Sequence, residues 1–390
     1  MLKKITLIFL FLSSCSGPSI FTSIPLSTSS PTLAKPISMS IDETNARAYV
    51  VNSNYTFMYQ DASLLVLDLS NPIAPGTRNA VSIKNYSGQS YLDATNHRLY
   101  VTNRLSTDVN DTVDQILRIN VNETDSHFLQ VDEFNADVNP FGIIGDGTNL
   151  YTVCQNSLDR YLLSDLTHRT RIDFQNTLSA GQTYLTTDTR EAAIAPDSAH
   201  IFVSNRSDKL LILNTSDILT PDPSQEVTAP GGEAMDYALT STSSTRGIAS
   251  DGTYIYVVEA SPPALKILTD RNLGPVVGAP IETSLASLAV AEIPLAPDPN
   301  EVAVDVINHR AYVSLSQDHQ ISVIDTQLFR EIARISVRDN LPSGVKSGEY
   351  PFALSVGHFG GTAYVYVMNL NTNTISIING TTLAIVASYP

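Results

Sequence analysis

The sequence predicts an all-β fold, a seven-bladed β-propeller with four-stranded antiparallel blades in a single ring domain. One observation is a repeat, because an aromatic residue followed by Val or Thr recurs seven times at spacings of 51, 51, 51, 54, 56 and 54 residues. A period of about 50 residues is typical of propellers, solenoids and other arrays. A second observation is that most repeats contain four β-rich runs separated by turns. The anchor residues of the repeat are Tyr49, Tyr100, Tyr151, Phe202, Tyr256, Tyr312 and Tyr366.

The order of runs within one repeat favours a four-stranded meander. The first run ends in a turn such as Asp146-Gly147 or Asp251-Gly252, and Asp-Gly between apolar runs is typical of a hairpin because Gly tolerates positive φ. The anchor run follows, and then a third run that ends in Asp or Asn, as at Asp68 and Asp325. A fourth run closes most repeats. Meandering four-stranded units pack best radially, so we expect a propeller in preference to a solenoid.

The ends of the ring are also predicted. The first blade begins with its own innermost strand at residues 36–42, and the last blade ends with its own outer strand at residues 384–388. We therefore expect the ring to close by packing of blade against blade, without an exchanged strand. The alternative is that residues 20–26 dock as an extra outer strand.

Some segments resemble a known family. The run Tyr100-Val101-Thr102-Asn103 and the run Pro351-Phe352-Ala353-Leu354 before a strand resemble the Tyr-Val-Thr-Asn (YVTN) repeat β-propellers of bacterial and archaeal envelopes. The resemblance covers about residues 36–390. It implies the propeller fold and an envelope location, and it implies no particular activity, because the repeat mostly defines that family.

The N-terminus predicts export and a lipid anchor. Residues 1–14 read as a signal peptide, with Lys3 and Lys4 before an apolar run that is too short to span a bilayer. The segment ending at Cys15 is similar to a bacterial lipobox, in which the Cys is lipidated and holds the protein to a membrane surface. The alternative is an ordinary signal peptide with an incidental Cys. Residues 15–35 form the lipidated Cys and a flexible Ser/Thr/Pro tether, and residues 36–390 the propeller.

Location and partners follow from this start and from composition. We expect the protein in the bacterial cell envelope, facing the periplasm or the exterior, and in the outer membrane if the source is Gram-negative. The chain has 39 acidic and 23 basic residues and a formal net charge of −16, which argues against a nucleic-acid partner. It has no Trp and no haem-attachment motif, so neither haem nor quinone is expected. Cys154 is expected to be a small buried hydrophobic residue.

One face of the ring is the predicted binding face. The connections between second and third strands and those between blades emerge on the same side, several are long, and binding residues concentrate on such loops. We expect this face and the channel mouth to be acidic, serving a basic partner or a hard cation such as Ca²⁺. The alternative is that these Asp residues cap their own turns. The candidates are Tyr55, Phe57, Tyr59, Asp61, Arg104, Asp159, Arg206, Asp208, Glu259 and Asp318.

A weak metal candidate lies in the same face. The alternate residues Asp108, Asn110, Thr112 and Asp114 resemble the ligand spacing of calcium loops, but the Gly at the sixth position and the distant Glu of such loops are missing. The seven His residues fall on different parts of the predicted ring, which argues against a His-based metal site.

Function is predicted only in outline, and no catalytic residue is assigned. The leading hypothesis is a membrane-anchored binding or interaction scaffold for an envelope or extracellular protein or glycan. The alternative is a lactonase-like or other hydrolytic propeller that acts on a small polar substrate. A third hypothesis is a purely structural spacer. A deep polar pocket with clustered carboxylates would favour the enzyme, and a flat aromatic rim would favour binding.

Overall fold

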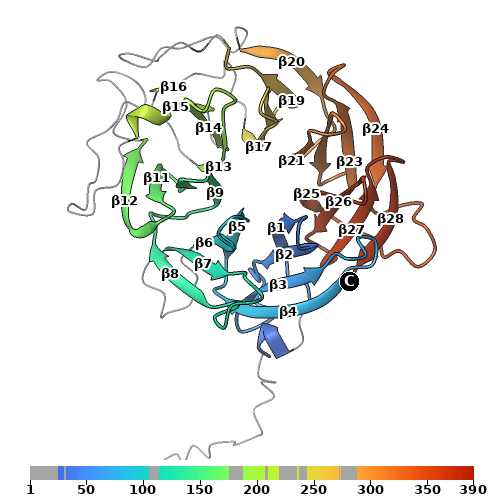
Figure 1. Cartoon of the computed structure of the whole chain (residues 1–390). Coiled ribbons are helices and arrows are strands. Elements are labelled where there is room, and N and C mark those ends of the chain that lie inside the picture. The colour runs from blue at the N-terminus through green and yellow to red at the C-terminus, as the bar shows by residue number, and fades with distance from the viewer. Residues whose placement is uncertain are drawn as a thin grey trace, which may run out of the picture.

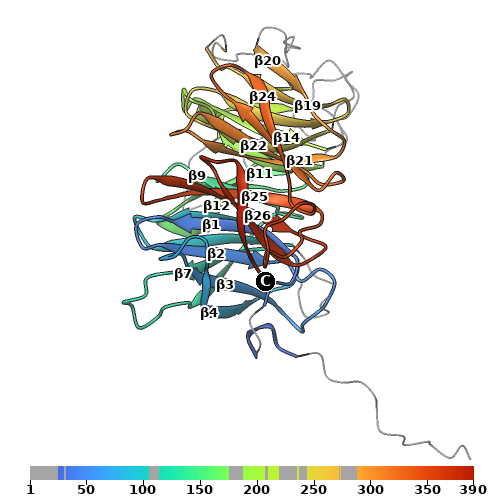
Figure 2. The ribbon, with the colours of Figure 1, turned by 90° about the vertical axis from the view of Figure 1, so that its right-hand side faces the viewer.

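The computed structural model describes residues 25–29, 32–104, 114–174, 188–206, 210–218, 235–236, 244–271, 273 and 288–390. Seven sheets of four antiparallel strands stand around a central axis (Figure 1), and the strands of each sheet follow one another in chain order. Figure 2 shows the ring from the side. The predicted seven-bladed β-propeller is therefore confirmed. No helix among the described residues is long and apolar enough to cross a membrane.

The first three blades run from the blue to the green part of the ring in Figure 1. Blade 1 contains β1 (Pro36–Asp42), β2 (Arg47–Asn52), β3 (Ala62–Asp68) and β4 (Gly76–Ile83). Blade 2 contains β5 (Ser87–Asp93), β6 (Arg98–Asn103), β7 (Gln115–Asn120) and β8 (Val131–Asn135). Blade 3 contains β9 (Gly142–Gly145), β10 (Asn149–Val153), β11 (Ser157–Leu162) and β12 (Asp165–Asp173). In all three, the first strand lies innermost.

The other four blades complete the ring. Blade 4 contains β13 (Thr189–Ile194), β14 (His200–Asn205), β15 (Leu211–Asn214) and β16 (Met235–Asp236), and blade 5 contains β17 (Thr245–Ser250), β18 (Ile255–Ala260), β19 (Pro263–Leu268) and β20 (Ala289–Pro294). Blade 6 contains β21 (Pro299–Asp305), β22 (Arg310–Leu315), β23 (Gln320–Asp325) and β24 (Arg330–Ser336), and blade 7 contains β25 (Pro351–Phe359), β26 (Thr362–Asn369), β27 (Thr374–Asn379) and β28 (Ala384–Tyr389). Two short 3₁₀ turns, η1 (Ser27–Ser29) and η2 (Thr215–Asp217), flank the sheets.

The anchor residues of the repeat form the interfaces between blades. Each of the seven apolar clusters contains one anchor and joins two neighbouring blades. Tyr49 of blade 1 packs with Leu99 and Val101 of blade 2, for example, and Tyr366 of blade 7 packs with Val50 of blade 1. All seven anchor side chains are almost completely buried. The period of the sequence is therefore the period of the blade-to-blade core.

The Asn at the end of the anchor strand is structural. Asn52, Asn103 and Asn205 are buried, and each binds the backbone of the segment that enters its own blade. The Oδ1 atom of Asn52 accepts a hydrogen bond from the amide of Ala34 at 3.0 Å, and Nδ2 of Asn103 donates one to the carbonyl of Asn85 at 2.8 Å. An amide side chain can satisfy a buried peptide group that no strand pairs, which explains why the motif ends in Asn.

The ring closes as predicted, by packing. Strand β28 pairs with β27 and β1 pairs with β2, so no strand is exchanged among the described residues. Residues 25–29 form a turn against β3 and β4, where the amide of Ser27 donates to Asp61 at 2.8 Å. They add no strand to blade 1, and residues 20–24 lie outside the described residues. His358 of β25 also joins blades, because its Nε2 lies 3.0 Å from Asp305 of blade 6 and its Nδ1 3.1 Å from Glu43 of blade 1.

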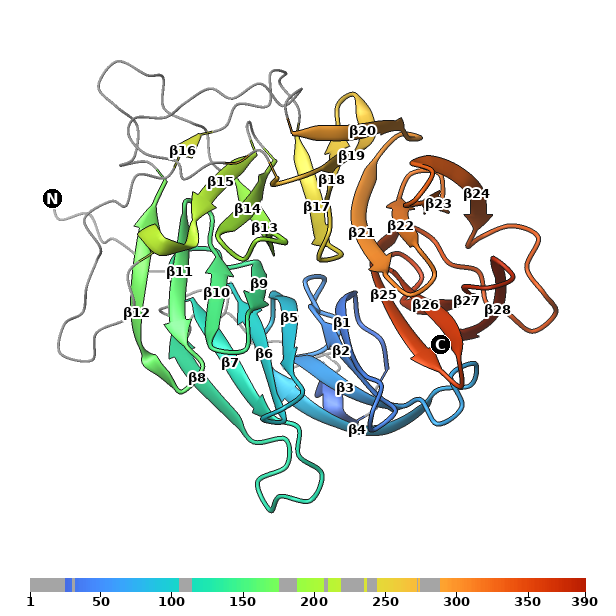
Figure 3. The same ribbon diagram turned by 45° about the horizontal axis from the view of Figure 1, so that its top comes forward.

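A bulge begins most of the innermost strands. In six of the seven blades, the pairing of the innermost strand with its neighbour shifts register near the first residues of that strand. A bulge turns side chains out of the regular alternation and is common beside functional sites. Here the bulges lie at the end of the ring axis where the innermost strands begin, as the tilted view in Figure 3 allows the reader to follow. They supply half of the candidate site.

Candidate functional site

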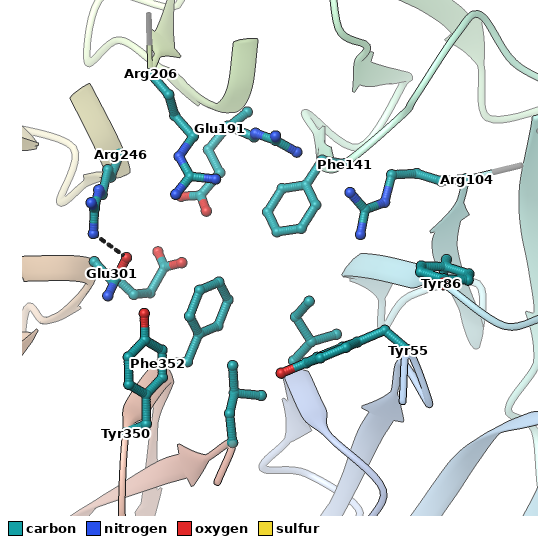
Figure 4. Close-up of a pocket in the computed structure, with 14 residues that line it drawn as sticks. Tyr55, Tyr86, Arg104, Phe141, Glu191, Arg206, Arg246, Glu301, Tyr350 and Phe352 are labelled. Atoms are coloured by element: carbon teal, nitrogen blue, oxygen red, sulfur yellow. Dashed lines mark hydrogen bonds between the residues drawn. The ribbon is translucent and has the colours of Figure 1, made fainter. Parts of the chain in front are cut away.

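The site is a cavity of about 390 Å³ at the channel mouth, within the size range usual for small-molecule sites. Its lining comes from the bulges and from the connections that emerge beside them (Figure 4). The bulges contribute Ile37, Arg190, Glu191, Arg246, Asn300, Glu301 and Phe352. The connections contribute Tyr55, Tyr86, Arg104, Phe141, Arg206, Tyr350 and Leu370.

Four arginines line this cavity, which makes its charge opposite to that of the whole chain. Arg190 pairs with Asp188 at 2.7 Å, and Arg246 pairs with Asp298 at 2.6 Å. Arg104 and Arg206 form no ion pair with any carboxylate among the described residues, although both line the same cavity. The expectation of an acidic channel mouth is therefore wrong for the part of the chain that the structure describes.

The arginines repel one another. Burial lowers the pKa of the Arg104 guanidinium, and the charge of Arg190 lowers it further. Partial removal from water lowers the pKa of Arg206, and the guanidinium groups of Arg190 and Arg246 add to this effect. A lowered pKa means that the surroundings disfavour the positive charge, so an anion placed among these groups would be stabilised.

Phe141 separates two of the arginines. The guanidinium carbon of Arg104 lies 5.6 Å from the centre of its ring, and that of Arg190 lies 5.4 Å from it. Both distances allow cation–π attraction, which offsets part of the repulsion between the two cations. The phenyl ring of Phe141 thus helps to hold the two positive charges of Arg104 and Arg190 at one wall of the cavity.

Two glutamates meet inside the cavity. Glu191 of β13 is buried, and Glu301 of β21 lines the same cavity, where its carboxyl interacts with that of Glu191. Burial raises the pKa of both carboxyls, and the neighbouring Glu301 raises that of Glu191 further. Because two carboxylates in contact cannot both ionise at low cost, the pair keeps a proton to a higher pH than free carboxyl groups do.

Glycines bring the strands of this pair close to the blade before them. A Cβ atom at Gly142 would overlap the backbone of Arg190 and Glu191, and one at Gly247 would lie 2.6 Å from the Cα atom of Glu301. Only glycine permits this approach without moving the neighbouring strand. Both glutamates are further fixed through their amides, which donate to side-chain hydroxyls at 3.1 and 3.0 Å.

Aromatic and apolar side chains form the opposite side of the cavity. Tyr55 and Phe352 lie across from Arg206 in Figure 4. Ile37 and Leu370 also line the cavity. Tyr350 is held at the edge, because its hydroxyl interacts with Asp298. The arginines, with Phe141 and Tyr86 beside Arg104, therefore lie on one side of the cavity, Tyr55 and Phe352 lie across from Arg206, and the carboxyl pair lies near Arg206.

The structure gathers only part of the predicted binding face. Tyr55, Arg104 and Arg206 line the cavity. Phe57 lies outside it, 40% exposed and edge-on to Tyr86. Three more candidates lie outside the lining. The hydroxyl of Tyr59 bonds to Thr32, Asp61 accepts from Ser27, and Asp318 is exposed in the turn between β22 and β23.

Two predicted acidic residues differ most from the expectation. Asp159 and Glu259 are fully buried inside their own blades instead of facing solvent on the loop side. Arg169 pairs with Asp159 at 2.7 Å, and Lys266 pairs with Glu259 at 3.0 Å. Burial raises the pKa of Asp159 to about 6. Because a buried charge is costly without a partner, each carboxylate needs the basic residue that its own sheet supplies.

Other candidates fall partly outside the structure. Asp208, the calcium candidates Asp108, Asn110 and Thr112, and the lipidation site Cys15 all lie outside the described residues. Asp114 is described and accepts a hydrogen bond from the amide of Asn139 at 2.8 Å. Within the described ranges, no group of three His, Cys, Asp or Glu side chains could hold a metal ion. Cys154 is buried and unpaired by any disulfide, as expected.

The sequence did contain a signal for the residues that were missed. Arg190 and Glu191 precede Phe202 by twelve and eleven residues, and Asn300 and Glu301 precede Tyr312 by the same intervals. Ile37 precedes Tyr49 by twelve. An alignment of the repeats on their anchors would therefore have placed these residues at two adjacent structural positions.

The fold and this axial cavity define the class as a seven-bladed β-propeller with a candidate small-molecule site at its channel mouth. No protein-family model matches the chain, and no curated protein matches it. Solved structures do match the chain. A chain of Kuenenia stuttgartiensis hydrazine synthase matches with a TM-score of 0.57 and 16% identity over 93% of this chain and 99% of that one.

Two further structures give the same result. Apo AztD from Citrobacter koseri matches with a TM-score of 0.50 and 13% identity, over 91% of this chain and 86% of that one. The β-propeller domain of Myceliophteria thermophila Cps50 (Swd1) matches with a TM-score of 0.57 and 9% identity, over 88% of this chain and 96% of that domain. At such identities these matches support the shared fold and carry no information on activity.

Proposed function

We propose that this chain is a lipid-tethered propeller of the bacterial cell envelope whose channel mouth binds a small organic anion. The observation that carries the proposal is the set of four arginines around one cavity, two of them without an ion pair among the described residues. Hydrogen bonds between guanidinium and carboxylate groups are charge-assisted and geometrically specific. A bound carboxylate would relieve the repulsion that lowers the pKa of Arg104 and Arg206.

The anion is either a free small acid or an acidic group on an envelope glycan or protein. The chain as a whole is negative, with a formal net charge of −16, so an anion is attracted by the local field of the cavity and not by the whole surface. This local attraction fits a ligand that enters one site better than a large anionic partner that covers the surface.

The envelope location rests on the sequence. The signal-like residues 1–14, the lipobox-like segment ending at Cys15 and the resemblance to YVTN repeat propellers support it. We expect the expressed protein to incorporate labelled palmitate and to sediment with membranes. A Cys15→Ser variant should lose the label and leave the membrane fraction, and a variant that keeps both would contradict the anchor.

Isothermal titration tests the anion site. Glucuronate, citrate and benzoate are compared with glucose and benzyl alcohol, which lack a carboxylate. We expect binding of at least one of the acids and of neither neutral compound. Arg206→Met should weaken that binding about 10- to 100-fold, because a hydrogen bond to a charged group contributes about 1.5–3 kcal/mol. The matched control is Arg334→Met on the outer strand β24, whose partner is Glu331 at 2.7 Å.

The pair of carboxyls favours a second candidate function, the hydrolytic one. Glu191 and Glu301 share a proton inside a polar cavity, and such a pair can serve as general acid and base beside cationic groups that stabilise an oxyanion. Incubation with a panel of lactones and glycosides tests it. Turnover that Glu301→Gln abolishes would support hydrolysis, whereas binding without turnover would support the binding protein.

A further inference from the structure

The two sides of the cavity differ in chemistry, and together they restrict the ligand. Arg206 lies close to the carboxyl pair, since its charge acts on the Glu191 carboxyl. Tyr55 and Phe352 lie on the opposite side (Figure 4). A ligand that fills the space between must therefore present an anionic group to one wall and an apolar surface to the other.

The carboxyl pair adds a third requirement. The Oε2 atom of Glu191 accepts from the amide of Ile248 at 3.3 Å, and Oε1 of Glu301 accepts from the amide of Val302 at 3.4 Å. Both bonds are long, and a pair that shares one proton between its two carboxyls keeps free acceptor lone pairs on its oxygens, which line the cavity. A buried polar pair left facing an apolar ligand would lose its solvation without compensation.

We infer that the ligand is a hydroxylated ring carboxylate, an acidic sugar of the uronic acid type. Its carboxylate binds the Arg206 side of the cavity, the apolar face of its ring packs on Tyr55 or Phe352, and a ring hydroxyl donates a hydrogen bond to an oxygen of Glu191 or Glu301. This inference rests on the proposed anion site and specifies its ligand class. A ring acid without hydroxyls can bind the arginine side and the aromatic side chains, but not the carboxyl pair. A neutral sugar can bind the aromatic side chains and the carboxyl pair, but not the arginine side.

Titration with three matched ligands tests the inference. Glucuronate carries ring, hydroxyls and carboxylate, cyclohexanecarboxylate lacks the hydroxyls, and glucose lacks the carboxylate. We expect glucuronate to bind at least about 100-fold more tightly than either, because sites that bind a ligand hydroxyl strongly reject the analogue without it. Equal binding of glucuronate and cyclohexanecarboxylate would overturn the inference and leave the anion site standing. Failure of every acid to bind would overturn both.

Two variants test whether the carboxyl pair binds the ring hydroxyl of the ligand. Glu301→Gln should weaken glucuronate binding about tenfold or more, because the carboxyl pair binds a ring hydroxyl of this ligand. It should leave cyclohexanecarboxylate binding within about twofold, because that ligand has no hydroxyl for the pair to bind. Glu191→Gln should act in the same direction, and Glu331→Gln on β24 is the control, since that residue pairs with Arg334 away from the axis. Equal losses for both ligands would overturn the assignment. A thermal melt of each variant confirms that the ring is intact.

A further titration distinguishes a free sugar acid from the same acid at the end of a glycan. The free monosaccharide is compared with an oligosaccharide that ends in the same uronic acid. Tighter binding of the oligosaccharide identifies the end of a glycan as the ligand, and weaker binding identifies the free sugar acid. Both results keep the uronic acid as the recognised unit, and the absence of binding by both overturns the inference.

Discussion

The carboxyl groups of Glu191 and Glu301 come from the innermost strands of blades 4 and 6 and interact with each other inside the channel mouth. Blade 5 lies between those two blades, and at this level its innermost strand presents Arg246 and Gly247. Because Gly247 has no side chain, Glu301 can approach from the next blade. The pairing therefore depends on three blades at once.

The pair makes stability depend on pH. Burial raises the pKa of Glu301 to about 7, above its ordinary value, so the folded state binds the shared proton more tightly than the unfolded chain does. Its contribution is complete below the ordinary carboxyl pKa and is lost as the pH rises through about 7. We expect the free energy of unfolding to fall by on the order of 1–3 kcal/mol across this window. Glu301→Gln should flatten the dependence in urea titrations, and an unchanged slope would contradict the shared proton.

The close approach of strands predicts the effect of two glycine substitutions. Gly142→Ala and Gly247→Ala place a methyl group against the backbone of the next blade, so each should cost about 1–3 kcal/mol of stability. Both should also displace a glutamate and weaken acid binding. Gly76→Ala is the control, because no atom lies within 4 Å of its added Cβ. Chemical denaturation measures all three, and equal stability of the Gly142 and Gly76 variants would refute the steric argument.

The Asn that ends the anchor strand should matter for folding and not for binding. Asn103→Ala leaves the buried carbonyl of Asn85 without its donor, which should cost about 1–3 kcal/mol. The affinity of the channel mouth should change less than about twofold, because Asn103 does not line the cavity. A large loss of affinity in a variant that melts normally would show that the motif Asn acts in binding.

His358 should strengthen the closure of the ring at low pH. Burial disfavours its charge, but hydrogen bonds to Glu43 and Asp305 outweigh burial and raise the pKa of the imidazole. Its contribution is complete below the ordinary pKa of about 6.5 and is lost as the pH rises through the higher folded value. We expect His358→Gln to lower the melting temperature more at about pH 5.5 than at about pH 9. His127→Gln, at an exposed position, is the control.

The sequence predicted the ring well because packing between blades repeats. An aromatic residue is needed once per interface, and the seven anchors follow from that need. The site was predicted only in part. Arg104 and Arg206 were found because they follow the anchor strands directly, where a loop is expected.

The rest of the site depends on geometry that residue types do not reveal. Arg190 and Glu191 stand in an innermost strand, and only the bulge there turns them toward the axis. Conversely, Asp159 and Glu259 belong to loop-side positions by sequence but are fully buried, and each meets a basic residue of its own sheet. A single sequence does not show which neighbour a side chain faces when that neighbour belongs to a different strand or blade.

The bulges have one more consequence. The charged bulge residues, such as Arg246 and Glu301, lie outside the seven apolar clusters that hold neighbouring blades together. These charged positions can therefore change without changing the apolar clusters, whereas Ile37 and Phe352 both line the cavity and pack in those clusters. In a ring of repeated blades, the charged bulge residue of one blade can be substituted without changes in the other blades. A library of variants limited to these positions should therefore change the ligand preference and keep the propeller fold.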